Sequence, residues 1–413
     1  MAAEPFYNAQ INDSIYSAFA GIAGDPEKWK KLDQRFMDIR AARKIRIAVM
    51  LCMAFALCMF FGGCTPEKKG GTRTIGISMP SKAIERWSRD GEYLKDRFES
   101  QGYNVELRYS DEDINHQIED IQVLIADDVD LLIVVAVDGS ALFRTLEDAD
   151  YKNIPVIAYD RLIMDSDAVD CYVSFDNYQV GVLQAQFIAD ELGLENSEET
   201  YSIELVSGDP ADNNAVFFYN GARSVLDPYL DSGKLNIPSG KLEFLQTSTP
   251  NWSTDKAFEN MQNILASYYS DRKRLDAVLC ASDALSLGAS QALMSDYAGG
   301  NMSVITGQDA DVAALQNIVD GRQTMTIFKN VKTEANMAVE VAEAILNGEE
   351  LTSSLAEDFT DDCVFDTSSY DNGSKIVPSY LLVPEVITAG NLDTLVGTGL
   401  YKWDRDRRYL VAK

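Results

Sequence analysis

The chain has 413 residues, with 46% hydrophobic and 24% charged residues, which is typical of a globular protein of two or more domains. Its net charge of −29 argues against nucleic acid as a partner and against a basic membrane patch, because phosphate binding needs a positive surface. His116 is the only histidine, which excludes a site with two histidines and argues against a Ser-His-Asp catalytic triad.

Residues 1–64 are predicted to be an export segment. A basic stretch precedes an apolar run of 17 residues, 47–63, which is short for a membrane-spanning helix and slightly long for the core of a signal peptide. Its end, "FFGGC", resembles a bacterial lipoprotein cleavage site with Cys64 as the acylated residue; an uncleaved anchor helix is the alternative. Met37 is a candidate for the true start, and residues 65–73 read as a polar tether. Either interpretation places the rest of the chain outside the cytoplasm.

From residue 74 onward, apolar strands alternate with amphipathic helices. Continuous apolar runs such as "DLLIVVAV" (130–137) indicate strands that are covered on both faces. The alternation predicts an α/β fold with a right-handed, doubly wound parallel sheet. The predicted strands of this first unit are 74–79, 104–110, 130–137 and 154–160, and its predicted helices are 83–102, 114–128 and 141–153.

The alternation restarts after residue 177 and predicts a second α/β unit of similar size. Its predicted strands are 201–209, 242–248, 275–282 and 302–309, and its predicted helices are 178–193, 214–233, 253–271 and 283–297. Two similar lobes in one exported chain indicate a cleft that closes around a hinge.

The last part of the chain is predicted to return to the first unit. Residues 312–321 and 333–348 have helical spacing, and 323–330 reads as a strand. An acidic, loop-like insert follows, then a strand pair broken by Pro378 and Pro384. We assign 74–176 and 327–350 to the N-terminal lobe, 177–326 and 376–388 to the C-terminal lobe, 351–375 to the insert and 389–413 to a tail of undetermined structure.

Polar side chains follow the predicted strands in both lobes. In open α/β sheets ligands bind beyond the carboxyl ends of the strands, so these side chains are expected to line one site. Their carboxylate, amide, guanidinium, ammonium and indole groups suit a sugar, since planar polar groups can bridge neighbouring hydroxyls and an indole can pack on the ring. The candidates are Arg86, Trp87, Asp138, Asp160 and Arg161 from the first lobe, Asp212, Asn213, Asn214, Trp252, Asp283 and Asp309 from the second, and Lys329 near the hinge.

Several candidates have a purely structural alternative. Asp160 and Arg161 can form an ion pair that braces a loop, and Trp252 can cover the edge of a core. Asp283 and Asp138 can each cap the helix that follows them. The sequence shows neither a metal cluster nor a Gly-rich phosphate loop, and no cofactor is expected. Cys171, Cys280 and Cys363 are expected to be buried, with at least one free thiol.

Seven stretches, in this order, resemble the bacterial xylose-binding and multiple-monosaccharide-binding receptors of ABC transporters. They are "ERWSRDG", "VIAYDRLI", "VSFDNYQVGVLQAQ", "GDPADNNA", "VITGQDAD", "TMTIFKN" and "VPSYLL". The resemblance covers about residues 74–388 and implies a type I periplasmic-binding fold, with two lobes joined by a hinge of crossing strands and a monosaccharide held between them.

The resemblance also implies a role for each matching position. Arg86 and Arg161 would donate to sugar oxygens, and Asp160 would accept from hydroxyls. Asn214, with Asp212, would contact the sugar from the second lobe, Trp252 would stack on it, and Asp309 and Lys329 would complete the network near the hinge. Ser282 stands where relatives carry asparagine or tyrosine, which leaves the identity of the sugar open.

The expected function is an extracytoplasmic, lipid-anchored binding protein that delivers a monosaccharide to a membrane permease, without enzymatic activity. Three alternatives remain open at this point. A sugar-acting enzyme would use Asp160 and Asp309 as a carboxylate pair, although both have cationic neighbours that would keep them ionised. The effector domain of a sugar-responsive repressor shares the fold but is disfavoured by the export segment. A receptor that reports to a sensor kinase is compatible with transport.

Overall fold

A computed structural model describes residues 71–360 and 362–413. The predicted export segment, Cys64 and most of the tether lie outside the described residues. Among the described residues, no helix has the length and hydropathy needed to cross a membrane.

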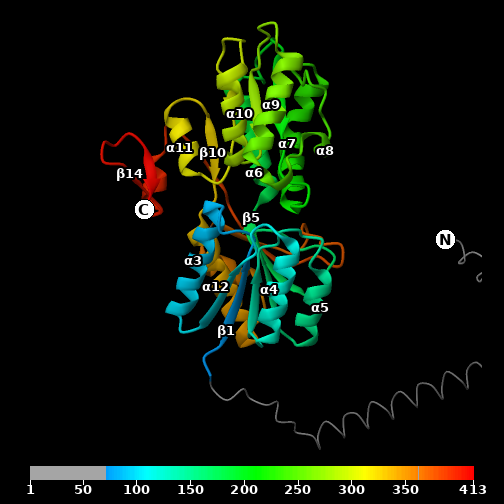
Figure 1. Cartoon of the computed structure of the whole chain (residues 1–413), viewed down its shortest axis with the longest axis vertical. Coiled ribbons are helices and arrows are strands. Elements are labelled where there is room, and N and C mark those ends of the chain that lie inside the picture. The colour runs from blue at the N-terminus through cyan, green and yellow to red at the C-terminus, as the bar shows by residue number, and fades with distance from the viewer. Residues whose placement is uncertain (1–70, 361) are drawn as a thin grey trace, which may run out of the picture. The chain divides into compact units, whose positions relative to one another are not determined.

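The first lobe is built on a seven-stranded sheet with the order β11-β12-β5-β4-β3-β1-β2 (Figure 1). All neighbours pair in parallel except β11, which runs antiparallel to β12 at the edge. Strands β3 and β4 are apolar and buried along their whole length, which is typical of a parallel sheet whose two faces are both covered by helices. The strands are β1 (Thr74–Met79), β2 (Asn104–Tyr109), β3 (Leu131–Val134), β4 (Val156–Tyr159), β5 (Val169–Phe175), β11 (Cys363–Asp366) and β12 (Ser379–Leu382).

Helices cover both faces of this sheet. One core lies between the sheet and α3, α12 and α13, and it includes Trp87, Leu94 and Phe98. The other lies between the sheet and α4 and α5, and it includes Ile121 and Leu146. The helices are α3 (Glu85–Ser100), α4 (Ile114–Ala126), α5 (Phe143–Tyr151), α12 (Val331–Asn347) and α13 (Ser353–Phe359).

The second lobe repeats this arrangement around a smaller parallel sheet of order β7-β6-β8-β9. Helices α9 and α10 share a core with one face, and α6 and α7 share a core with the other. The elements are β6 (Tyr201–Val206), β7 (Leu235–Asn236), β8 (Ala277–Cys280), β9 (Val304–Ile305), α6 (Asn177–Glu191), α7 (Asn213–Asp231), α8 (Phe244–Thr247), a 3-10 turn (Pro250–Trp252), α9 (Thr254–Tyr268), α10 (Asp283–Asp296) and α11 (Val312–Val319). The predicted fold of two doubly wound parallel lobes is confirmed.

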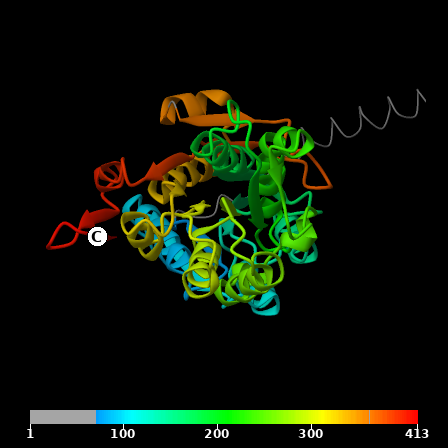
Figure 2. The same ribbon diagram turned by 90° about the horizontal axis from the view of Figure 1, so that it is seen from above.

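The chain passes between the lobes three times: after β5, after β10 (Met325–Phe328) and after β12. Strand β10 pairs antiparallel with β13 (Glu385–Thr388) beside the second lobe, and Gln308 bridges to Ile327 of β10. The C-terminal segment adds α14 (Asp393–Gly397) and a hairpin of β14 (Tyr401–Trp403) and β15 (Leu410–Ala412). In both views this segment lies beside α11 (Figures 1 and 2).

Three expectations differ from the structure. The insert 351–375 is not all loop, because it contains α13 and β11, and β11 extends the first sheet. The pair 376–388 is divided between the lobes: β12 pairs with β5 of the first lobe, and only β13 lies with the second. Residues 242–248 were expected as a strand, but Glu243 and Gln246 form a capping box that starts the short helix α8, and only Ser248 bridges to Ser207.

Candidate ligand-binding site

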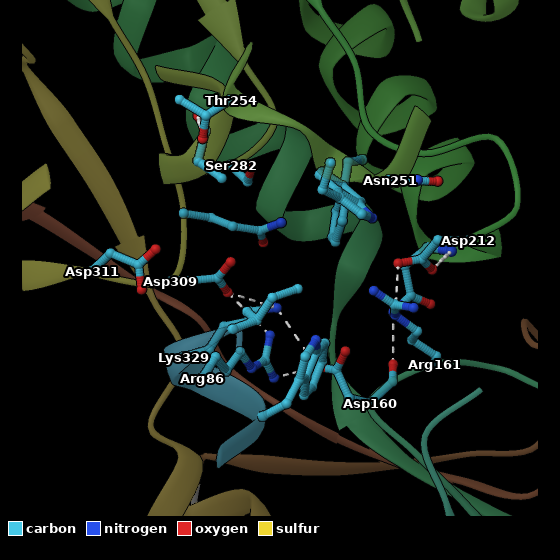
Figure 3. Close-up of a pocket in the computed structure, with 17 residues that line it drawn as sticks. Arg86, Asp160, Arg161, Asp212, Asn251, Thr254, Ser282, Asp309, Asp311 and Lys329 are labelled. Atoms are coloured by element: carbon cyan, nitrogen blue, oxygen red, sulfur yellow. Dashed lines mark hydrogen bonds and ion pairs between the residues drawn. The ribbon is translucent and has the colours of Figure 1, made fainter. Parts of the chain in front are cut away.

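A cavity of about 240 Å³ lies between the two lobes and takes walls from both (Figure 3). This size suits a molecule smaller than a typical drug. Ten of the thirteen candidate residues line it, and Asp138, Asn213 and Asp283 do not, so most of the strand ends far apart in the sequence do converge. The lining residues are Ile84, Arg86, Trp87, Asp160, Arg161, Asp212, Asn214, Phe218, Asn251, Trp252, Thr254, Ser282, Ala284, Gln308, Asp309, Asp311 and Lys329.

Asp160 directly follows the buried strand β4 and has a positive φ of 58°, which is unusual for a residue with a side chain. Its backbone carbonyl accepts hydrogen bonds from Tyr172 Oη at 2.6 Å, Ser174 Oγ at 2.9 Å and Asn214 Nδ2 at 2.6 Å. These bonds hold the turn and aim the Asp160 carboxylate at the cavity. Because Asn214 belongs to α7, the same carbonyl also joins the two lobes.

Arg86, in the first turn of α3, is the centre of a buried ion network. Its Nη1 lies 3.0 Å from Asp309 Oδ1, and its Nη2 pairs with Asp160 Oδ2. Lys329 Nζ reaches the same two carboxylates, at 3.1 Å from Asp309 and 3.6 Å from Asp160 (Figure 3). Each carboxylate therefore faces two cations, and the Arg86–Asp309 pair joins the first lobe to the second.

Two further carboxyl groups, which the sequence analysis missed, complete the surroundings of Arg86. Glu334 Oε2 of α12 lies 3.2 Å from Nη2, and Asp90 Oδ2 lies 3.4 Å from Nε. Both side chains are fully buried, and burial raises the pKa of Asp90 to about 6 and the pKa of Glu334 well above its ordinary value, despite Arg86. Burial thus favours protonated forms of these two groups.

Asp160 behaves differently. Burial alone would raise its pKa, but Arg86, then Lys329 and Arg161, outweigh burial and hold the pKa below its ordinary value. Asp160 is therefore ionised at neutral pH and can only accept hydrogen bonds. An ionised acceptor beside guanidinium donors can bind hydroxyl groups, but it does not supply a general acid.

Arg161 forms a second link between the lobes. Its Nε lies 3.0 Å from Asp212 Oδ2, and its Nη1 donates to the Ala136 carbonyl at 2.9 Å. Burial raises the pKa of Asp212, and Arg161 partly offsets this effect. The Arg86 and Arg161 guanidinium groups lie 4.6 and 5.2 Å from the centre of the Trp87 ring. The Trp87 ring therefore packs against both of these cations.

Trp252, together with Phe218, is an aromatic ring that the second lobe contributes to the cavity. It is partly exposed, and its ring lies edge-on to Phe218 at 6.3 Å between centroids. The ring also lies on Gly208, where an added Cβ would come within 2.0 Å of it. Gly208 therefore leaves the space in which the indole sits, and Asn251 and Trp252, both with positive φ, form the turn that presents it.

The structure does not place Asp283 among the residues that line the cavity. Ser282 is the N-cap of α10, which turns the next side chain inward. Asp283 accepts hydrogen bonds from Gln323 Nε2 at 2.8 Å, from Thr326 Oγ1 at 3.0 Å and from the Asp311 backbone N–H at 2.9 Å. It thus holds the turn that carries Asp309, whose φ is 96°.

Gln308 is the clearest lining residue that the sequence analysis missed. It is buried, and its Oε1 has no hydrogen-bond partner among the described residues. Ser282 Oγ accepts from Leu285 N–H, at 3.4 Å, which leaves its own hydrogen free to donate. While the charged residues are largely engaged with one another, these uncharged groups keep hydrogen-bonding capacity for a ligand. The position of Gln308 next to Asp309, after β9, was the available signal.

The structure also places the three remaining cysteines and Asp138. Cys171, Cys280 and Cys363 are free and buried. Asp138 accepts from Ser140 N–H at 2.9 Å, whereas α5 begins only at Phe143, so Asp138 is not the cap of that helix. Within the described part of the chain, no group of three or more His, Cys, Asp or Glu residues could hold a metal ion.

Comparison with known proteins agrees with this geometry. Residues 75–350 match the periplasmic binding protein domain. The multiple sugar-binding periplasmic protein of Azospirillum brasilense is 41% identical over 353 residues, which is 84% of this chain and 95% of that protein. The D-xylose-binding periplasmic protein of Haemophilus influenzae is 34% identical, over 79% of this chain and 90% of that protein.

Among solved structures, an ABC transporter solute-binding protein from Clostridium phytofermentans with bound β-D-glucose is similar, with a TM-score of 0.76 and 42% identity. The match covers 81% of this chain and 99% of that one. The chain therefore belongs to the periplasmic binding protein family and has its type I fold.

Proposed function

We propose that this protein captures one monosaccharide between its lobes by hinge closure and delivers it to an ABC permease. The observation that carries the proposal is the cavity between the lobes, where ionised Asp160, the guanidinium groups and Trp252 meet. The three relatives are named for, or hold, sugars: several sugars, D-xylose and β-D-glucose. Their names supply the substrate class that the cavity alone does not specify.

The mechanism follows from the links between the lobes. The Arg86–Asp309 and Arg161–Asp212 pairs and the bond from Asn214 to the Asp160 carbonyl all require the lobes to be close together. A bound sugar adds further bridging hydrogen bonds and favours this closed form, which the permease would recognise. A sugar that lacks a hydroxyl would leave a buried partner unsatisfied, at a cost of about 1–3 kcal/mol for each group.

A thermal-unfolding screen of the purified full chain tests this proposal. D-Xylose, D-glucose, D-galactose, D-ribose and myo-inositol are added separately, and at least one should stabilise the protein, by about 2.7 kcal/mol at one hundred times its dissociation constant. Arg161→Ala and Asp309→Ala should abolish the response and remain folded. Lys152→Ala, which breaks an exposed ion pair with Asp128, is the matched control and should respond like the wild type. A panel in which no sugar stabilises the protein would refute the proposal.

We further propose that Cys64 carries a lipid that anchors the protein to the outer face of the cell membrane. The basis is the small residues before Cys64 at the end of an apolar run. Mass spectrometry of the membrane-extracted protein should show an acylated N-terminal Cys64, and Cys64→Ala should release the protein from the membrane. An intact segment before Cys64 in the mature protein would contradict the anchor.

A further inference from the structure

The C-terminal segment, residues 389–413, forms a small core of its own against the second lobe and the hinge. Leu392, Leu395, Tyr401 and Leu410 pack with Phe328 of β10 and Leu315 of α11. Because β10 leads directly to Lys329 of the site, this core lies behind one wall of the cavity. Neither the fold prediction nor the proposed function gives this segment a role.

Tyr401 connects the segment to the turn that carries Asp309. Its side chain is 1% exposed, and its hydroxyl donates a hydrogen bond to the Ala310 carbonyl at 2.9 Å. Asp309 and Ala310 have φ values of 96° and 52°, which are costly for residues with side chains and persist only where neighbours hold them. The Tyr401 bond is one of the contacts that hold this turn, together with the Asp311–Asp283 bond.

The same hydroxyl faces the first lobe. Arg89 of α3 places Nη1 3.5 Å from Tyr401 Oη, and its guanidinium lies 6.0 Å from the centre of the Tyr401 ring. A second contact joins Lys332 Nζ of α12 to the Thr398 carbonyl at 3.4 Å. Figure 2 shows the C-terminal segment beside the region of α3 and α11. The segment therefore touches both lobes next to the hinge.

These contacts parallel the ion pair inside the cavity. Arg89 lies one helical turn after Arg86, and Ala310 directly follows Asp309, while Arg86 and Asp309 lie 3.0 Å apart. Tyr401 thus joins the same helix to the same turn from the outside. A contact that spans both lobes is made in the closed form and is lost or weakened when the lobes separate, so it changes the energy of closure.

We propose that residues 389–413 are a strap that holds the Asp309 turn against α3 in the closed form, with Tyr401 as a positioning residue for sugar binding. The inference rests on the proposed function and adds a determinant of affinity that does not touch the sugar. A contact that served the fold alone would change the free energy of unfolding but leave the dissociation constant of the sugar unchanged.

The test is calorimetric titration of the full-length wild type, Tyr401→Phe and Tyr409→Phe with D-glucose and D-xylose. Tyr401→Phe keeps the packed ring and removes only the hydroxyl. Tyr409→Phe is the matched control, because Tyr409 belongs to the same segment and its hydroxyl donates at 2.8 Å to Asp320, at the end of α11 and away from the turn. The Tyr401 variant should bind roughly three- to ten-fold more weakly, through faster dissociation, and the Tyr409 variant should bind like the wild type.

Each outcome is decisive. Wild-type affinity in the Tyr401 variant, or an equal loss in both variants, overturns the strap while the proposed function stands. A wild type that binds neither sugar overturns the proposed function for these sugars and the strap together. Melting temperatures of the sugar-free variants show whether Tyr401→Phe has folded, and a variant that unfolds is replaced by Lys332→Met, which keeps Tyr401 and removes the contact with the Thr398 carbonyl.

Discussion

Replacing Arg86 with methionine is the most informative perturbation of the buried ion network. Arg86 is 5% exposed and faces Asp309 at 3.0 Å, Glu334 at 3.2 Å and Asp90 at 3.4 Å, besides its pair with Asp160. Methionine fills much of the volume but carries no charge. Lys329 then remains the nearest cation to Asp160 and Asp309. Removing one partner of a buried ion pair typically costs about 3–5 kcal/mol, so we expect a loss of that size near pH 8.

The loss should depend on pH, and its sign follows from the protonation of Asp160. In the wild type Arg86 holds the pKa of Asp160 down against the effect of burial. Without Arg86, burial raises the folded-state pKa, so the folded variant takes up protons that the unfolded chain does not hold. Its stability is then present at low pH and is lost as the pH rises through the folded pKa. The difference from the wild type should therefore be smaller near pH 5 than near pH 8.

Urea unfolding of the sugar-free protein at these two pH values measures both quantities. Arg144→Met is the matched control, because Arg144 is exposed and its guanidinium lies 5.6 Å from the Phe143 ring; we expect a change within about 0.5 kcal/mol. A loss below about 1 kcal/mol for Arg86→Met, or an equal loss at both pH values, would refute the reasoning about the network.

Three further predictions follow from the surroundings of the cavity. Burial raises the pKa of Asp90 to about 6, above its value in the unfolded chain, so the free energy of unfolding of the wild type should decline between about pH 4 and pH 6. Asp90→Asn should remove up to about 3 kcal/mol of this decline in urea unfolding. Parallel pH profiles for the wild type and the variant would contradict this expectation. Gly208→Ala places a Cβ on the Trp252 ring and should weaken sugar binding in titrations, whereas Gly397→Ala, with open space around it, should not. Asp283→Ala leaves the Asp311 N–H without its acceptor and should lower the free energy of unfolding by about 1–3 kcal/mol. It should also weaken sugar binding. Unchanged affinity would show that the Asp309 turn keeps its conformation without Asp283.

The sequence was sufficient to predict the two α/β lobes, because the apolar strands and amphipathic helices alternate without interruption from residue 74. The same alternation placed most site residues, since Asp160, Asn214 and Asp309 all follow a strand. It could not decide which sheet a short strand joins. Ser379–Leu382 and Glu385–Thr388 both read as brief apolar strands, and only the pairing shows that they belong to different lobes.

The residues that the structure places away from the cavity, and those that the sequence analysis missed, depend on contacts that a single element does not show. Asp283 follows β8 as the rule requires, but capping by Ser282 turns its side chain away from the cavity. Asp90 lies one helical turn after Arg86 on α3, and Glu334 lies on α12; both carboxyl groups are buried where these helices meet around Arg86. The helical pattern of a single element does not show which charges a neighbouring element will cover.

The central claim is that side chains from both lobes converge on one sugar ring. A crystal structure of the protein with the most strongly stabilising sugar of the screen tests it most directly. We predict one sugar in the cavity, with hydroxyls within hydrogen-bond distance of Asp160, Arg161 and Asn214 and one face of the ring against Trp252. A sugar bound elsewhere, or an empty cavity in crystals saturated with that sugar, would contradict the account.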